Sequence, residues 1–307
     1  MAQQIEETIM RSVFSPEEYS ITSNNNNSKY IIKTLDEQKC LTLSLNPNNI
    51  YIDILEKCGK PGTDSLRKVD ELAKKIPNVE YIGLEDQSEL IKCDYTIKLA
   101  TIKILTKGES WYNSLGYISD NYEIERAENK KIIEMKYADF IEKVYNIYFE
   151  QNKNKLITLR QELSEKEDQL KNAVNGEEMY KRILRSISLT KELISLYTGR
   201  IDINAMEEYK RKSQKIFPYT KNETVQEYFT DVWYDINNSK DCNEEKYSWL
   251  DSFLQKVINS NILHYDVNLK KIVNISTKNT EGKGGYKTKN KTKRKIPRKQ
   301  KKSRSKK

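Results

Sequence analysis

The stretch IYIDILEKCGKPGTDSLRKVDELAKKIPNVEYIGL, residues 50–84, decides the fold of the N-terminal part of this chain. It begins with an apolar, β-branched run at Ile50–Leu55 and continues through a loop containing Gly and Pro. Apolar residues then recur at helical spacing, at Leu66, Val69, Leu72, Ala73 and Ile76. Pro77-Asn78 ends the helix and Val79–Leu84 is a second apolar run. The order strand, helix, strand predicts a βαβ crossover whose two strands are parallel neighbours.

The residues before this stretch predict further strands. Tyr30–Leu35 is rich in apolar and β-branched residues, and Cys40–Leu45 alternates leucine with threonine and serine. The turn residues Asn46–Asn49 separate the second run from Ile50–Leu55, so this pair reads as a β-hairpin. Residues 1–29 are polar and end in Asn24–Asn27, which predicts a loop or arm.

The residues after the stretch are mainly helical in pattern. Tyr95–Leu105 has the spacing of a helix. From residue 122 to about 215, two long charged helices with leucine and isoleucine stripes are joined at Asn175-Gly176, which predicts an antiparallel helical hairpin. Two aromatic-rich helices, Glu223–Ile236 and Glu244–Ser260, precede a predicted β-hairpin over Ile262–Ile275.

These patterns predict an α+β protein, with an N-terminal mixed β-sheet flanked by helices and a mostly helical C-terminal half. The expected divisions are a polar arm over 1–29, an α/β domain over 30–120, a helical region over 121–217, a small helical and β-hairpin region over 218–276, and a disordered basic tail over 277–307. A protein partner for the helical half is a further possibility.

The net charge of +9 comes from the end of the chain. Residues 283–307 hold 14 Lys or Arg and no acidic residue, so removing them from the total of 54 leaves 40 basic against 45 acidic residues. Such a run repels itself and is expected to stay disordered. Its cations suit nucleic acid or another polyanion, bound nonspecifically through a dense cluster at Lys293, Arg294, Lys295, Arg298 and Lys299. A targeting signal and a solubilising tail are the alternatives.

The small numbers of cysteine and histidine residues limit the metal sites and catalytic mechanisms that this chain could have. The four cysteines Cys40, Cys58, Cys93 and Cys242 are scattered and there is a single histidine, His264, so no metal site is expected. The cysteines are expected to be free, buried and in a reducing compartment. His264 lies in an apolar/polar alternation typical of a strand, and no stretch has the roughly 18 apolar residues of a membrane span. The protein is therefore expected inside a cell.

The loop of the βαβ unit could hold an anion. A strand that runs through a Gly-containing loop into a helix N-terminus presents free backbone N–H groups and the positive end of the helix dipole. The alternative is that these glycines serve only the geometry of the turn. Thr63 or Asp64 is expected to cap the helix that follows.

Two segments together resemble the Gcn5-related N-acetyltransferases. Gly59-Lys60-Pro61-Gly62 before a helix is similar to the loop of that family, written [Gln/Arg]-x-x-Gly-x-[Gly/Ala], and Tyr112-Asn113-Ser114-Leu115-Gly116-Tyr117 is similar to its segment Phe-Tyr-x-x-Leu-Gly-Phe. The resemblance covers residues 30–120. It implies an acyltransferase fold, acetyl-CoA as the acyl donor, and an amine acceptor.

The resemblance also implies roles for particular residues. Lys57, Gly59, Lys60, Gly62 and Thr63 would bind the pyrophosphate of acetyl-CoA, and Tyr112 would return a proton to the departing thiolate. The loop departs from the family pattern, because Lys57 stands at the Gln/Arg position, Lys60 replaces the first Gly, and Pro61 has no N–H to donate. Trp111 and Tyr112 could instead be core aromatics.

Candidates for the base that deprotonates the acceptor are Glu85 and Asp86, which directly follow the strand Val79–Leu84. The tail, Gly-Gly-Tyr followed by Lys, Arg, Thr and Ser, resembles tails of proteins from large DNA viruses of eukaryotes, which implies the host cytoplasm, the nucleus or a virion. Two functions follow. The first is a divergent acetyl-CoA-dependent N-acyltransferase. The alternative is a non-catalytic viral or nucleic-acid-associated protein that its tail tethers.

Overall fold

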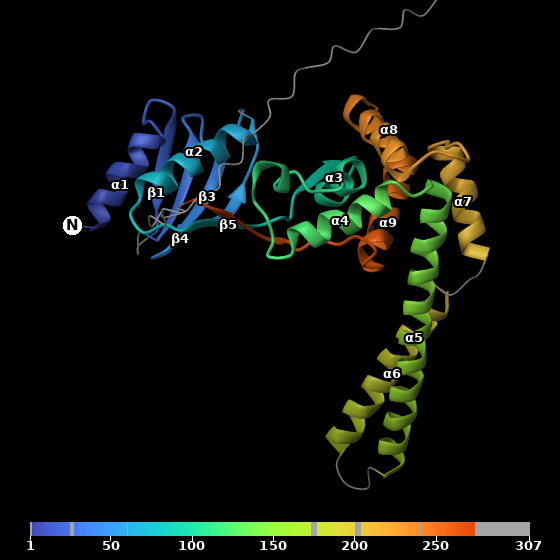
Figure 1. Cartoon of the computed structure of the whole chain (residues 1–307). Coiled ribbons are helices and arrows are strands. Elements are labelled where there is room, and N and C mark those ends of the chain that lie inside the picture. The colour runs from blue at the N-terminus through green and yellow to red at the C-terminus, as the bar shows by residue number, and fades with distance from the viewer. Residues whose placement is uncertain are drawn as a thin grey trace, which may run out of the picture. The chain divides into compact units, whose positions relative to one another are not determined.

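The structure is a computed structural model that describes residues 2–24, 28–59, 61–172, 177–199, 204–239 and 241–273 (Figure 1). The predicted turn at Asn175-Gly176 and the basic tail with Lys293, Arg294, Lys295, Arg298 and Lys299 lie outside these residues. In the described part of the chain, no helix has the length and apolar content needed to cross a bilayer.

The predicted α+β class is confirmed. The first part of the chain holds α1 (Ala2–Val13), β1 (Tyr19–Ser23), β2 (Lys29–Thr34), β3 (Lys39–Leu45), β4 (Asn49–Leu55), α2 (Gly62–Lys75), β5 (Tyr81–Glu85), β6 (Glu89–Lys92), β7 (Tyr95–Lys98) and α3 (Leu99–Lys107). The second holds the 3₁₀ turn η1 (Asn113–Leu115), α4 (Tyr122–Ile133), α5 (Tyr137–Asn172), α6 (Glu177–Gly199), α7 (Asn204–Ile216), α8 (Val225–Asn238), α9 (Glu244–Asn259) and β8 (Asn268–Ile272).

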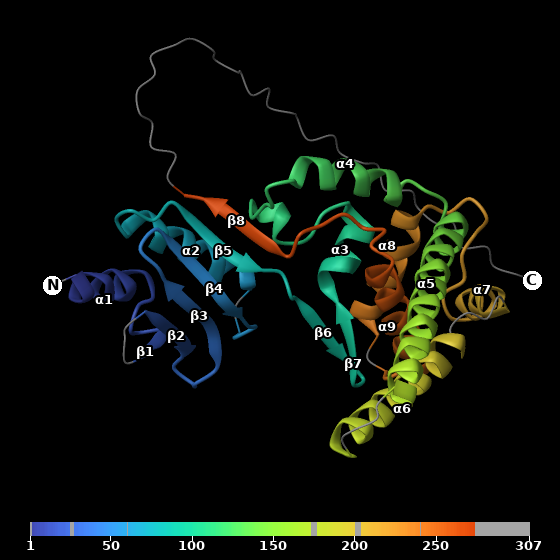
Figure 2. The ribbon, with the colours of Figure 1, turned by 90° about the horizontal axis from the view of Figure 1, so that it is seen from below.

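The central element is a mixed sheet with the strand order β1-β2-β3-β4-β5-β8 (Figure 2). Strands β4 and β5 are parallel, with Ile50 beside Ile82 and Ile52 beside Leu84, and α2 makes the connection between them. The predicted βαβ crossover is therefore confirmed. Every other ladder of this sheet is antiparallel.

One face of the sheet is buried under α1 and α2. Alternate strand residues such as Ile50 and Ile52 point into this core, while Tyr51 and Asp53 point to the other face. Met10 from α1, Phe14 just after it and, from α2, apolar residues at helical spacing that include Leu66, Val69 and Leu72 fill this core. The arm expected over residues 1–29 thus contains a helix and a strand. Met10, Val13, Phe14 and Tyr19 from this polar segment are buried in the core, so the overall composition of the segment gave a wrong prediction.

The C-terminal strand completes the sheet. A hairpin was predicted over residues 262–275, but the described residues there form the single strand β8, which pairs antiparallel with β5 from Tyr81↔Ile272 to Glu85↔Asn268. His264 lies outside any strand and its side chain is exposed, so the prediction of a strand histidine is wrong. A period-two pattern says that a segment is extended but not which strand it will join.

The segment between β5 and η1 also differs from the prediction. Residues 95–105 were expected to form one helix, but Tyr95–Lys98 is β7, the second strand of a hairpin with β6, and only then does α3 begin. The two turn residues, Cys93 and Asp94, have φ values of 52° and 65°. A two-residue turn with both φ values positive fits the twist of a hairpin, but it usually shows Asn-Gly or Asp-Gly in the sequence.

The helical half has its own apolar core. Tyr137 of α5 is fully buried and stacks on Tyr228 of α8 with ring centroids 3.5 Å apart. Helices α5 and α6 lie side by side, as predicted (Figures 1 and 2). Lys166 of α5 donates a hydrogen bond to Thr190 of α6, and Lys191 of α6 forms an ion pair with Glu167 of α5. A capping box of Thr224 and Glu227 fixes the start of α8.

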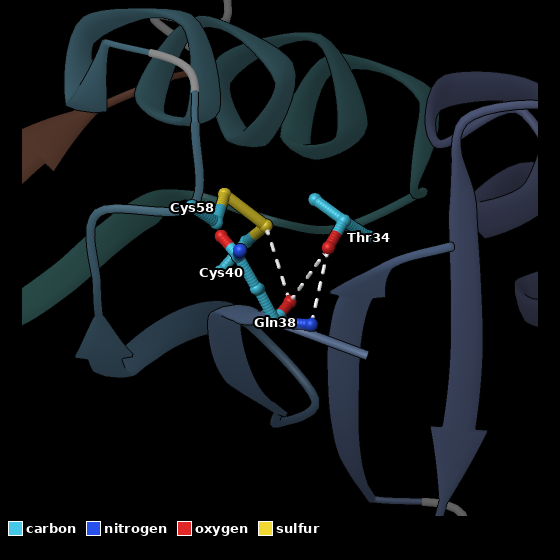
Figure 3. Close-up of a disulfide and its surroundings, with 4 residues drawn as sticks. All are labelled: Thr34, Gln38, Cys40 and Cys58. Atoms are coloured by element: carbon cyan, nitrogen blue, oxygen red, sulfur yellow. Dashed lines mark hydrogen bonds between the residues drawn. A yellow bond between two sulfur atoms is a disulfide. The ribbon is translucent and has the colours of Figure 1, made fainter. Parts of the chain in front are cut away.

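All four cysteines are paired, so the prediction of free thiols is wrong. Cys40 of β3 bonds to Cys58 in the loop before α2 (Figure 3). Cys93 in the β6–β7 turn bonds to Cys242 before α9. The positions of the four cysteines in the sequence do not predict these pairs, because each disulfide joins segments that only the tertiary fold brings together. Disulfides persist in oxidising surroundings, so the reducing compartment inferred from the cysteines loses its support.

We expect alkylation of the denatured, unreduced protein to modify no cysteine, and alkylation after reduction to modify all four, as read by mass spectrometry. The variant Cys40→Ala/Cys58→Ala should lose about 3 kcal/mol of unfolding free energy through the entropy of the opened loop, whose ends are 18 residues apart. Urea unfolding measures this loss. Four modified cysteines without reduction would contradict both disulfides.

We also expect stability to fall in alkali. Burial raises the pKa of Tyr137 well above its usual value, whereas an unfolded tyrosine ionises near pH 10. The contribution of the protonated Tyr137 to the free energy of unfolding is thus intact below about pH 10 and is lost above it. The loss is roughly 1.4 kcal/mol per pH unit for each such tyrosine, because only the unfolded chain releases the proton. Urea unfolding of Tyr137→Phe from neutral pH to about pH 11 should show a shallower fall.

The matched control for this experiment is Tyr234→Phe, because Tyr234 is 71% exposed. Its pH dependence should equal that of the parent protein. An equal slope for Tyr137→Phe and the parent would show that Tyr137 ionises at the same pH in both states.

Candidate functional site

A cavity of about 790 Å³ opens where the parallel strands β4 and β5 end. Ligand sites in sheets with parallel strands favour this edge, because the loops that leave the carboxyl ends diverge there. Four groups of residues line the cavity: the end of β4 with the loop to α2, the end of β5 with the start of β6, the pair Trp111 and Tyr112, and one wall from α3 and α8.

Four of the six residues assigned to acetyl-CoA by resemblance line this cavity, namely Lys57, Gly59, Gly62 and Tyr112. Thr63 is exposed and does not line it, and Lys60 lies outside the described residues. The fold therefore brings the loop before α2 and the segment around Tyr112, about fifty positions apart in the sequence, to one cavity.

The loop reaches the cavity through a constrained path. Gly59 has a φ of 78°, which favours glycine over other residues, and Cys58 beside it is bonded to Cys40 of β3. Gly62 has a packing role, because a Cβ atom there would lie 3.2 Å from Cη2 of Trp111. The disulfide holds the loop against the sheet, and Gly62 leaves room for the indole.

Helix α2 begins at Gly62, with Pro61 at the N-cap and no side-chain cap, so the prediction that Thr63 or Asp64 caps it is wrong. The Asp64 N–H donates to the Pro61 carbonyl at 2.9 Å. The N–H groups of Gly62 and Thr63 precede it in the first turn, where an α-helix supplies no acceptor. Of these two residues, Gly62 lines the cavity, and an uncapped helix start of this kind is suited to a negatively charged group.

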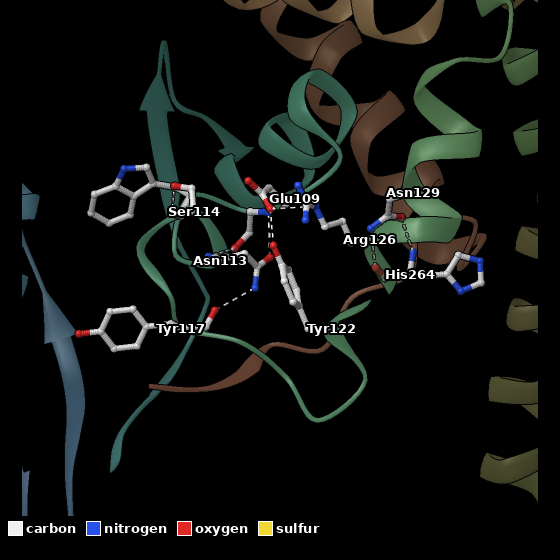
Figure 4. Close-up of polar contacts among 10 residues, drawn as sticks. Glu109, Asn113, Ser114, Tyr117, Tyr122, Arg126, Asn129 and His264 are labelled. Atoms are coloured by element: carbon white, nitrogen blue, oxygen red, sulfur yellow. Dashed lines mark hydrogen bonds and ion pairs between the residues drawn. The ribbon is translucent and has the colours of Figure 1, made fainter. Parts of the chain in front are cut away.

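The segment carrying Tyr112 is held by one asparagine (Figure 4). Asn113 accepts from the Ser110 N–H at 2.9 Å through Oδ1 and donates to the Tyr117 carbonyl at 3.0 Å through Nδ2. Gly116 ends the turn with a φ of 89°, and Tyr117 is fully buried. This turn fixes where Trp111 and Tyr112 enter the cavity.

Tyr112 is a buried tyrosine with a shifted pKa. Its side chain is 8% exposed, and its pKa is raised first by this burial and second by the nearby Asp86 carboxylate. Asp86 is itself buried, and its Oδ1 accepts hydrogen bonds from the N–H and the hydroxyl of Ser88. The raised pKa makes the Tyr112 phenol a weaker acid than an exposed tyrosine, and at neutral pH it carries its proton as any tyrosine does.

Helices α3 and α8 form the far wall of the cavity. The Lys103 ammonium of α3 lies 4.6 Å from the ring centre of Trp233 on α8, a cation–π contact. The pKa of Lys103 is lowered, first by burial and second by the neighbouring Lys107. Sequence reasoning missed both residues at the site, because each sits in an ordinary amphipathic helix pattern.

Acidic residues complete the lining. Asp53, Glu56, Glu85 and Glu89 all face the cavity, and of these the sequence analysis named only Glu85. Asp86, the other candidate base, does not line the cavity. The signal that could have found Asp53 is its register, since it points away from the helix-covered core at the end of β4.

Comparison with known proteins adds no assignment: no family model, no curated protein and no solved structure matches this chain.

Proposed function

We propose that this protein transfers an acyl group from acyl-CoA to an amine in the cavity at the ends of β4 and β5. The observation that carries the proposal is that Lys57, Gly62 and Tyr112 line one cavity. The resemblance links this loop to pyrophosphate and this tyrosine to proton transfer. A cavity at the carboxyl ends of parallel strands is the place where such a ligand would bind.

Two features of the loop before α2 support binding of the phosphate end of acyl-CoA. The first-turn N–H groups of α2 and the Lys57 ammonium would hold it, and Pro61 removes one backbone donor. Lys57 supplies a point charge, whereas the arginine or glutamine of the resembled family would form directed hydrogen bonds. Acyl-CoA would supply the activated acyl group as a thioester.

The residues near the reacting atoms have separate tasks in this proposal. As the new C–N bond forms and the C–S bond breaks, the amine loses a proton and the sulfur gains one. The Tyr112 phenol is protonated at neutral pH, as an ordinary tyrosine is, and would give this proton to the sulfur, while its raised pKa makes it a weaker acid than an exposed phenol. Glu85, an exposed carboxylate on the cavity lining, would take the proton from the amine. Proton return from Glu85 to Tyr112 through solvent closes the cycle.

The first test is calorimetric titration of acetyl-CoA into the full chain and into Gly62→Arg. We expect saturable binding that this substitution abolishes, because the new side chain displaces Trp111 and fills the cavity. The matched control is Gly199→Arg, which adds the same side chain and charge at the end of α6, where a Cβ atom meets nothing within 4 Å. Equal binding by all three proteins would place acetyl-CoA outside this cavity.

The second test replaces Tyr112 by Phe. The ring and its packing against Trp111 remain, but the proton donor is lost. We expect kcat to fall by roughly 10²–10⁴, as for loss of a general acid, with acetyl-CoA binding unchanged. Measurement of CoA release with an amine acceptor reads the effect. An unchanged kcat would remove Tyr112 from the reaction and leave it as a wall of the cavity.

A further inference from the structure

Helix α6 has one apolar edge that stays exposed. The helix packs on α5 (Figure 1) through buried and half-buried side chains at steps of three and four residues, namely Ile183, Ile187, Thr190, Ile194 and Tyr197. A second series of apolar residues on the same helix keeps between 42% and 61% of its surface exposed: Met179, Leu189, Leu193 and Leu196. We call these four residues, together with Ser186, the α6 seam.

The α6 seam has the spacing of a coiled-coil contact. Met179 and Ser186 are seven positions apart, and steps of three, four and three lead from Ser186 through the leucines to Leu196. At 100° per residue, the seam lies about a quarter of a turn from the side chains that pack on α5. Lys191, which pairs with Glu167 of α5, lies on the opposite edge. Helices in bundles carry such a second seam because they pack on two neighbours.

The C-terminal end of this chain does not offer a matching seam. From residue 274 onward the large apolar residues are Ile275, Tyr286 and Ile296, which are too far apart for heptad spacing. An exposed row of leucines on a helix marks a contact with another protein surface more often than a solvated face. A second protein chain is therefore the occupant to consider.

The charged residues beside the α6 seam indicate which chain fits. Arg185 and Glu192 each stand one position before a seam residue, on the same edge of the helix. Both are exposed, and among the residues that the structure describes neither has an ion-pair partner, although the neighbouring Arg182 pairs with Glu178. This edge offers one cation and one anion to a partner helix.

A second copy of α6 matches these charges when the two helices are antiparallel. If Ser186 of each copy faces Leu189 of the other, Arg185 comes beside Glu192 of the other copy, and the small serine leaves room for the leucine. The two-fold axis repeats the contact, so two ion pairs flank the apolar seam. A parallel pair offers no such match, because each charge would then lie beside an uncharged side chain of the other copy.

The same register gives the remaining seam residues apolar neighbours. Met179 faces Leu196 of the other copy, and Leu193 packs along the methylene stem of Arg182, whose guanidinium stays in water. Each seam residue is thus covered by a residue of the same helix in the other copy, as a self-complementary interface requires.

We propose that α6 is the interface of a homodimer, formed by antiparallel pairing of the α6 seam with the seam of a second copy. The proposal concerns an interaction surface and does not depend on the proposed enzymatic function. The occupant is a second copy because spacing, small residue and charges all match within this one helix.

The first experiment is sedimentation equilibrium of the full chain and of Leu193→Asp over the micromolar range. We expect the parent to reach twice its chain mass of 36.2 kDa and the variant to remain a monomer, because the change puts two carboxylates into the seam contact. The matched control is Leu184→Asp, since Leu184 and Leu193 are both 42% exposed but lie on opposite edges of α6. Leu184→Asp should dimerise like the parent.

The second experiment exchanges the charges. Arg185→Glu and Glu192→Arg should each weaken dimerisation about tenfold, because each turns two exposed ion pairs into two like-charge contacts. The double variant Arg185→Glu/Glu192→Arg should recover the affinity of the parent, because opposite charges meet again between the copies. The control is Arg211→Glu, the same substitution at an exposed position of α7, and it should leave the affinity unchanged.

Three results would overturn the proposal. A parent chain that stays monomeric would leave the α6 seam to a different protein. Equal effects of Leu193→Asp and Leu184→Asp on the dimer would place its interface elsewhere. A double charge variant as weak as the single variants would exclude the antiparallel contact of Arg185 with Glu192. Far-UV circular dichroism of each variant checks that the helices remain folded, which the exposure of every substituted side chain leads us to expect.

Discussion

The parallel pairing of β4 and β5 is the constraint on which the rest of the N-terminal structure depends. Two parallel neighbours need a long crossover connection, and here α2 both makes this crossover and buries the apolar face of the sheet. The same pairing ends both strands at one edge of the sheet. The loop before α2 and the segment after β5 leave from that edge, and the cavity lies between them.

Other interactions hold the walls of this cavity in place. The Cys40–Cys58 disulfide fixes the loop to β3, and the Cys93–Cys242 disulfide joins the β6–β7 turn to the segment before α9. Asn113 fixes the turn that carries Trp111 and Tyr112. Each of these constraints reduces the number of conformations available to a lining side chain, so less ordering remains to oppose the binding of a ligand.

Sequence reasoning worked where the signal was local. The βαβ unit, the α5–α6 hairpin, α8 and α9 all follow from apolar periodicity and turn residues within a short window. It failed where the partner was remote. β8 pairs with a strand almost two hundred positions earlier, α1 owes its burial to α2, and the disulfide partners are 18 and 149 positions apart. The β6–β7 turn was not predicted for a different reason, since its two residues, Cys93 and Asp94, are not a pair that usually marks a turn.

The candidate site divides in the same way. The sequence by itself indicated the loop Lys57–Gly62, because its glycines mark a turn, and the aromatic segment at Tyr112, because its order of residues is recognisable. Only the tertiary structure decided that Asp53, Lys103 and Trp233 join them in one cavity. Those three residues obey the ordinary patterns of a strand and two helices. Their proximity comes from strand pairing and helix packing. Both depend on contacts between distant segments, so no single position in the sequence predicts them.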